Sequence, residues 1–467
     1  MRAHTSSRFS RLGVAAALLA LVVAGARPAT AASDPMESQQ WNLAQIHAQT
    51  AWSVSTGDNV LVGIVDSGVS ANHEDLAGQV ADAVTCIGTN GSSSGCTPGG
   101  DDIDGHGTHV SGIVAAISGN GKGVAGVAPS AKIAMARVFS APSNAGAAPT
   151  AELSDVRAAI RYLAGTLHAK VVNLSIGADR QALQACAALT GCDSPLKDVV
   201  EEAWDLGALP VIASGNSQLY GSKGYGNLDA IVVGATTESN AVAPYSTATG
   251  NAKWAMVAPG GEIPANQAEP TAAEKARMVL STYGGPGCNP PSASDCYAGL
   301  SGTSMAAPHV SAVAAMLFAR GLDRQAVVDT LLSTTEPVPG CSQTRCGAGR
   351  VDAAKALGAI EKTTEPTSGG NRTTTSRAGN SKSSTTAARR TGGAAGTTST
   401  TSFGFANADS NNTTPTSRFP RDAIVLNQQP AAENDVPLRV ALFGIVCLAG
   451  AALALSYSLR RTLTTLP

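Results

Sequence analysis

Short apolar runs that alternate with helix-like segments are the feature of this chain that most restricts its fold. Each run has the length of a strand and is mainly apolar, which is typical of strands buried on both faces of a parallel sheet. Amphipathic or small-residue segments separate the runs, so the order reads β-α-β-α. We therefore expect an α/β fold with a mostly parallel central sheet and helices on both faces. The runs lie at residues 60–65, 132–139, 171–177, 209–216, 231–235 and 254–258.

Two polar side chains stand where such strands end. Asp66 follows the first run directly, and Asn216 closes the run that begins at Leu209. Open α/β sheets place their working groups at the carboxyl ends of the strands. Capping of a following helix is the alternative role for Asp66.

Two further polar residues open helices that are rich in small side chains. His106 lies between Gly105 and Gly107, and Ser304 begins a run that ends at Gly321. The free N–H groups and the dipole at a helix N-terminus favour negative charge, as a serine needs when it generates an oxyanion beside itself. The alternative for Ser304 is an ordinary N-cap on a core helix.

A metal site is the competing interpretation of the histidines. His106 and His109 could bind a metal together with the nearby acids. The H-x-x-H spacing, however, lacks the glutamate of a zincin motif. We therefore expect no metal here and a buried structural role for His109.

The polar residues together have the types that acyl transfer requires. Ser304 would attack a carbonyl carbon, and His106 would take the proton and later give it to the leaving amine. Asp66 would hold the imidazole in the correct tautomer. Asn216 would donate its side-chain amide to the oxyanion. The order Asp, His, Ser and an oxyanion asparagine are known from subtilisin.

Four sequence blocks carry a family resemblance over roughly residues 40–360. In their types and order they resemble the signature blocks of the subtilisin-like serine proteases, or subtilases. This resemblance implies a subtilisin-like fold, endopeptidase activity, the triad Asp66, His106 and Ser304, and oxyanion stabilisation by Asn216. The blocks are Val65–Gly68, Gly105–His109, Ala213–Asn216 and Gly302–Val310.

The resemblance also implies where a substrate binds. Ser175, Ile176 and Gly177 would line the primary specificity pocket and pair with the substrate backbone as an added strand. Ser214 and Gly215 would border the same cleft. The reaction requires no cofactor. Many subtilases bind calcium, and Asp75 matches one ligand position, but the loop around Asn120 aligns poorly, so calcium is expected only as a possible structural ion.

Cysteine spacing predicts four local disulfide bonds and an oxidising compartment. Eight of the nine cysteines form close pairs around Gly-, Ser- or Pro-rich loops, and Cys447 stands alone in an apolar run. A zinc site is the alternative, but none of the pairs has C-x-x-C spacing. The expected pairs are Cys86 with Cys96, Cys186 with Cys192, Cys288 with Cys296, and Cys341 with Cys346.

The two ends of the chain predict export and membrane attachment. Residues 1–32 have the basic, apolar and small-residue regions of a signal peptide. A peptidase domain would span 33–362, and a disordered Thr/Ser/Gly-rich linker 363–437. Residues 438–459 are apolar enough to span a membrane, and Arg460 and Arg461 would keep the tail 460–467 in the cytoplasm. We expect a single-pass cell-membrane protein with an extracellular catalytic domain.

The net charge of the predicted peptidase domain and the order of the predicted segments indicate which kinds of partner the protein binds. Residues 33–362 hold 18 Lys and Arg against 29 Asp and Glu, a net charge of 18 − 29 = −11, which argues against nucleic acid as a ligand. We expect protein or peptide substrates. The layout of signal, protease, linker and membrane span is similar to the mycosins of type VII secretion. The alternative function is therefore a structural or processing component of a secretion complex, in which cleavage is secondary.

Overall fold

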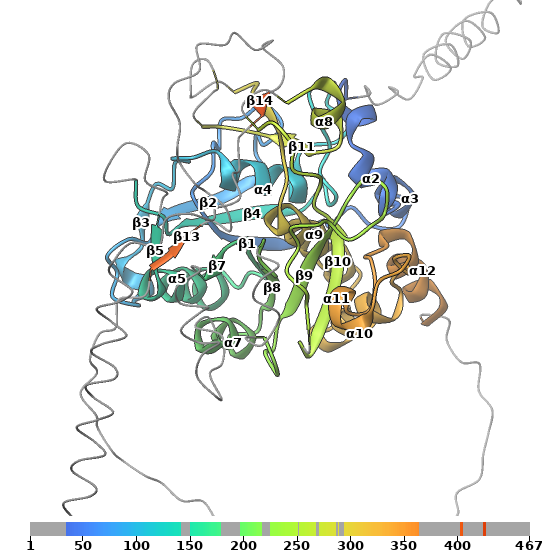
Figure 1. Cartoon of the computed structure of the whole chain (residues 1–467). Helices are drawn as coiled ribbons and strands as arrows, with labels where there is room; N and C mark the ends of the chain where they lie inside the picture. Colours follow the sequence, from blue (N-terminus) through green and yellow to red (C-terminus); the bar gives the residue numbers. More distant parts are fainter. Residues whose placement is uncertain are drawn as a thin grey trace, which may run out of the picture. The chain divides into compact units, whose positions relative to one another are not determined.

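The computed structural model describes the peptidase region and two short pieces of the segment that follows it (Figure 1). The predicted signal peptide, membrane helix and tail lie outside the described residues, as do the pair Cys186 and Cys192 and most of the linker. Within the described ranges, no helix is both long and apolar enough to cross a bilayer. The described residues are 34–141, 150–178, 197–216, 225–250, 252–267, 270–285, 288, 294–363, 402–404 and 424–425.

The centre of the fold is an eight-stranded sheet with the order β10-β9-β8-β6-β1-β4-β2-β3. Neighbouring strands are parallel except for β2 and β3, which are antiparallel. The predicted α/β fold with a mostly parallel sheet is therefore confirmed. The strands are β1 (Leu61–Asp66), β2 (Val80–Thr85), β3 (Thr97–Pro98), β4 (Lys132–Arg137), β6 (Val171–Leu174), β8 (Leu209–Ala213), β9 (Ile231–Thr236) and β10 (Trp254–Pro259).

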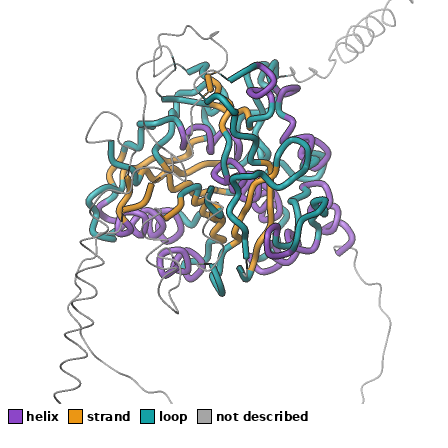
Figure 2. Tube along the Cα trace, in the orientation of Figure 1, coloured by secondary structure: helices purple, strands orange, loops and turns teal. Residues whose placement is uncertain are grey.

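Helices cover both faces of this sheet, as the strand pattern predicts (Figure 2). Side chains alternate between the faces, so Val171 packs in one core cluster and Val172 in the other. One cluster includes α4 (His106–Ala115), α9 (Thr303–Ala319), α10 (Arg324–Ser333) and α12 (Ala353–Thr363). The other includes α5 (Leu153–Ile160), which continues as the π-helical turn η3 (Arg161–Thr166), and α7 (Lys197–Asp205).

Two small sheets flank the central one. In the first, β11 (Val279–Thr282) is antiparallel to β12 (Tyr297–Leu300), and β14 (Ile424–Val425) is parallel to β12. In the second, β13 (Ser402–Gly404) lies between β5 (Thr150–Glu152) and β7 (Gly177–Ala178). Both β13 and β14 come from the segment predicted as a linker, whose residue pattern does not indicate strands. The remaining helices are η1 (Glu37–Gln39), α2 (Trp41–Gln45), α3 (Ala48–Ala51), η2 (Ser93–Gly95), α8 (Ala272–Ala276) and α11 (Gln343–Cys346).

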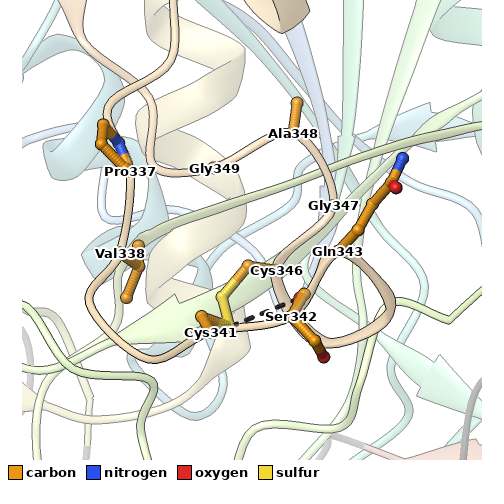
Figure 3. A pocket seen from close by; sticks show the side chains of 9 residues that line it. All are labelled: Pro337, Val338, Cys341, Ser342, Gln343, Cys346, Gly347, Ala348 and Gly349. Carbon is orange, nitrogen blue, oxygen red and sulfur yellow. Dashed lines mark hydrogen bonds between the residues drawn. A yellow bond between two sulfur atoms is a disulfide. The ribbon is translucent and has the colours of Figure 1, made fainter.

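Three of the predicted disulfide bonds are present: Cys86–Cys96, Cys288–Cys296 and Cys341–Cys346. The last one closes a loop that lines a surface pocket (Figure 3). All residues lining that pocket fall between Pro337 and Gly349, and none of them is a predicted site residue. The candidate site is therefore elsewhere, at the ends of the central strands.

Candidate active site

The candidate triad comes from three elements that are distant from one another in the sequence. Asp66 is the last residue of β1, His106 the first of α4, and Ser304 the second of α9. The two helices pack against each other over the same face of the sheet. All three residues are almost fully buried, with 0%, 3% and 3% of their surface exposed.

Asp66 and His106 form a short hydrogen bond. Nδ1 of His106 donates to Oδ1 of Asp66 at 2.8 Å, and the backbone N–H of Ser67 donates to the same oxygen at 2.7 Å. Because a carboxylate only accepts, Nδ1 carries the proton in the neutral ring and Nε2 is the nitrogen that can accept one. Burial alone would lower the pKa of His106, but the charge and hydrogen bond of Asp66 and the charges of Asp104 and Asp102 raise it above its usual value.

The position of His106 depends on Asp102, whose carboxylate holds the start of α4. One oxygen accepts from the Ser67 hydroxyl at 2.7 Å and from the Gly105 N–H at 2.8 Å. The other accepts from the Thr108 N–H at 2.8 Å. At Gly107 an added Cβ would lie 2.1 Å from the Gly68 carbonyl oxygen, so only glycine allows this approach of α4 to β1.

Asp104 adds a second acid beside the histidine. Burial and the negative charge of Asp102 raise the pKa of Asp104 to about 6. Its backbone is fixed because the Tyr283 hydroxyl donates to its carbonyl oxygen at 2.6 Å. Tyr283 itself is fully buried. The backbone that leads into His106 is therefore held by a hydrogen bond from Tyr283, the residue that follows β11.

Ser304 is connected to Ser175, in the short segment between β6 and β7. Its hydroxyl donates to the carbonyl oxygen of Ser175 at 3.2 Å, and the Ser175 hydroxyl donates to the carbonyl oxygen of Ser304 at 2.8 Å. Four residues after Ser304, Pro308 lies inside α9 and has no N–H to offer this carbonyl. Ser175 supplies the donor that the helix lacks at this point.

A buried polar network supports Ser175 from behind. The side-chain amide of Asn173 donates to the Ser175 hydroxyl at 2.9 Å, and the hydroxyl of Ser311 donates to the Asn173 carbonyl oxygen at 2.8 Å. All three side chains are fully buried. The network joins the end of β6 to the middle of α9. It fixes Ser304 relative to residues 175–177, the predicted substrate-binding segment.

Asn216 is oriented by the residue before the nucleophile. Its Oδ1 accepts from the backbone N–H of Thr303 at 2.8 Å and from the Thr303 hydroxyl at 2.9 Å. A backbone N–H can only donate, so the atom facing it is the oxygen, and Nδ2 is the donor end of the carboxamide. This orientation suits a donor to an oxyanion formed beside Ser304.

The structure places the other predicted cleft residues as follows. Ser175 and Ile176 are buried, and Gly177 begins β7. The Ser214 hydroxyl donates to the Thr247 carbonyl oxygen at 3.0 Å, so this side chain points into the protein and only its backbone can border a cleft. Gly215 has a φ of +94°, a conformation that suits glycine, and its N–H donates to the Thr303 hydroxyl at 3.1 Å.

Sequence reasoning missed Asp102, Thr303 and Asn173 as positioning residues. The sequence shows that they are polar and near the motifs, but their roles depend on partners that lie far away in the chain. Asn173 is an example, because its partner Ser311 lies 138 residues further on.

The environment of Asp75 does not fit a calcium ion. Its Oδ1 accepts from Asn120 Nδ2 at 2.9 Å, and its Oδ2 accepts from the Val124 N–H at 2.8 Å and from the Tyr297 hydroxyl at 3.0 Å. The Asn120 oxygen accepts from the Lys122 N–H at 2.8 Å, so the amide nitrogen faces Asp75. A cation needs oxygen ligands, whereas these groups present hydrogens. Among the described residues, no group of three or more His, Cys, Asp or Glu side chains could hold a metal.

Comparison with known proteins connects this geometry to a family. The model of the subtilase family matches residues 57–358. The chain is 32% identical to thermitase from Thermoactinomyces vulgaris over 326 residues, which covers 70% of this chain and 98% of thermitase. The chain belongs to the subtilase family. It is therefore a serine endopeptidase, a hydrolase, as the motifs predict.

Other proteases are similar over nearly the same share of this chain. An extracellular protease of Xanthomonas campestris pv. campestris is 31% identical over 70% of this chain, and the match covers 57% of that protease. Among solved structures, proteases from Pseudoalteromonas arctica align with a TM-score of 0.55 and 28% identity, covering 71% of this chain and 99% of the other. The similarity to the solved structure agrees with the subtilisin-like arrangement of the central sheet.

Proposed function

We propose that this subtilase hydrolyses peptide bonds in proteins or peptides outside the cell with Asp66, His106 and Ser304 as its triad. The observation that carries the proposal is the hydrogen bond from His106 Nδ1 to Asp66 Oδ1 at 2.8 Å. The packing of α4, which begins at His106, against α9, whose second residue is Ser304, supports it. That bond fixes the tautomer in which Nε2 can act as a general base.

The chemistry follows from these positions. Ser304 Oγ attacks the carbonyl carbon of the scissile bond, and its proton moves to Nε2 of His106. The C–N bond breaks as His106 gives that proton to the leaving amine. The acyl group stays on Ser304 until water, deprotonated by His106, releases it as a carboxylic acid. Asn216 Nδ2 donates to the oxyanion in both steps, and Asp66 stabilises the imidazolium.

The substrate backbone would bind along residues 175–177, as the family resemblance implies. The hydrogen bonds between Ser175 and Ser304 support this assignment, because they hold the strand edge directly beside the nucleophile. The Gly215 N–H donates to the Thr303 hydroxyl at 3.1 Å, which supports a position of residues 214–216 close to Ser304 as well. A substrate would then lie between these two segments.

The proposed location is the outer face of a membrane. A relative named as an extracellular protease supports export of the catalytic region. The three disulfide bonds within the described part of the chain support an oxidising compartment. The apolar run 438–459 supports a single membrane span. We propose no required cofactor, and the hydrogen bonds around Asp75 support a loop that is fastened without calcium.

The experiment that tests this function is labelling of the full chain with a fluorophosphonate, which reacts with an activated serine. We expect a label on Ser304 in the wild type, which is absent in Ser304→Ala and strongly slowed in His106→Ala. A folded wild-type protein that takes no label, or a label on another serine, would refute the assignment.

A second candidate is a scaffold within a secretion complex, which only the terminal apolar run and its mycosin-like layout favour. Complementation of a deletion strain separates the two. Full restoration of secretion by Ser304→Ala would favour the scaffold, whereas loss of secretion with normal protein levels would favour proteolysis.

A further inference from the structure

One segment of the chain's own C-terminal part lies on the edge assigned to substrate. Strand β13 (Ser402–Gly404) is the middle strand of a small antiparallel sheet, between β5 and β7 (Figure 1). Phe403 is paired with Ala178 and Gly404 with Gly177 on one side. On the other side, Ser402 is paired with Glu152 and Gly404 with Thr150.

The edge in question is next to the nucleophile. Strand β7 begins at Gly177, two residues after Ser175, and the Ser175 carbonyl oxygen accepts a hydrogen bond from Ser304 Oγ at 3.2 Å. An extended peptide that adds a strand to this edge is bound by its backbone, with little demand on its sequence. Without β13, strands β5 and β7 would leave one strand position open between them.

The direction of β13 matches that of a chain presented for cleavage. The pairing is antiparallel, so the step from Phe403 to Gly404 runs with the step from Ala178 back to Gly177. Continued along the edge, that direction leads toward Ser175 and the Ser304 hydroxyl. Extended at the same register, this pairing would bring residue 406 opposite Ser175, so the peptide bond presented to Ser304 is expected about two residues after Gly404.

The chain is long enough to reach its own cleft. Helix α12 ends at Thr363, and β13 begins at Ser402. The intervening residues could span about 130 Å if extended, and a flexible coil of this length has its ends roughly 35 Å apart. A linker that can extend to about 130 Å reaches farther than the diameter of a domain of this size, so binding within one molecule is sterically allowed and gives the segment a high effective concentration at the site.

We propose that Ser402–Gly404 is a built-in ligand of the substrate edge and that the enzyme hydrolyses its own linker about two residues after Gly404, where the register reaches Ser175. This inference rests on the proposed function of Ser304. The broken bond is a peptide C–N bond: water adds across it, the acyl side leaves as a carboxylate and the other side as an amine. The cut separates the peptidase from the apolar run 438–459.

The first experiment tests binding without catalysis. In full-length Ser304→Ala, the substitutions Ala178→Cys and Phe403→Cys place two thiols at directly paired positions. We expect a disulfide between them under mild oxidation, at a yield independent of protein concentration. Ala178→Cys with Ser399→Cys is the control, since that position lies outside the paired strand. Equal cross-linking of both pairs would overturn the proposal.

The second experiment tests cleavage in the active protein. We expect intact mass to show a first-order cut about two residues after Gly404 in the wild type and none in Ser304→Ala. Gly404→Pro removes a strand N–H and should slow the cut at least about tenfold, whereas Gly396→Pro should not. A fluorophosphonate-labelled, active enzyme that leaves its linker whole would overturn the proposal. Loss of both labelling and cleavage, with the cross-link intact, would instead overturn the proposed triad.

Discussion

The Ser175 hydroxyl donates a hydrogen bond to the backbone carbonyl of Ser304 at 2.8 Å. Pro308 has no N–H for this carbonyl. Ser175 therefore supplies the hydrogen bond that helix α9 lacks next to the nucleophile. Any movement of Ser175 and its neighbours is therefore coupled to movement of Ser304. A substrate that pairs with residues 175–177 would bind to a segment already attached to the group that attacks it.

Ser175→Ala should therefore reduce catalysis although the residue takes no part in proton transfer. The variant leaves a buried carbonyl without its donor, at a cost of about 1–3 kcal/mol, and we expect kcat/KM to fall roughly tenfold. Steady-state kinetics measure this effect. Ser311→Ala, one hydrogen bond further from the nucleophile, serves as the control and should fall less. Equal rates for Ser175→Ala and wild type would disprove the coupling.

Asn216→Ala should lower kcat with little change in KM. Its Nδ2 is assigned to the oxyanion, which forms only during reaction, so a loss of about 10²–10³ in kcat is expected. Thermal unfolding should show that the variant still folds. A variant that keeps more than about a third of wild-type kcat would exclude Asn216 from this role.

Asp104→Asn should extend activity to lower pH. The negative charge of Asp104 is one of those that raise the pKa of His106, after that of Asp66. His106 must be neutral to act as a base, so a lower pKa leaves it competent in more acidic solution. The acidic limb of kcat/KM should move to lower pH. Asp101→Asn, at an exposed position, is the control and should leave the limb in place.

Calcium removal should leave stability unchanged. Asp75 is held by N–H and O–H donors, so we expect EDTA to change Tm by less than about 2 °C in scanning calorimetry. Asp75→Asn should destabilise the protein by about 2 kcal/mol, because its NH2 group would face other donors. A large drop in Tm with EDTA, reversed by calcium, would contradict this description of the loop.

The fold and the main site residues could be predicted because their signals are local. Apolar runs predict β1, β4, β6, β8, β9 and β10, and the motifs place Asp66, His106 and Ser304 at the ends of strands and helices. Strand β2 could not be predicted in the same way, since it is only partly buried and has the pattern of a surface segment. The motif residues could be predicted without knowing which residues they contact in the fold.

The positioning residues could not be predicted, because each acts through a contact that the sequence does not show. Thr303 looks like part of a turn, yet it orients Asn216, which lies 87 residues away. The inward direction of the Ser214 hydroxyl, which donates to the Thr247 carbonyl oxygen, likewise depends on a partner that lies 33 residues away. Strand β13 is defined by its pairing with β5 and β7, which its own residues do not reveal.

The three disulfide bonds join cysteines only 10, 8 and 5 residues apart. Closing such short rings costs little chain entropy, and each ring is complete as soon as its own few residues are available. A chain exported from its N-terminus could therefore be oxidised pair by pair in the order of its sequence. Each thiol would meet its correct partner before most of the wrong ones had left the translocation channel.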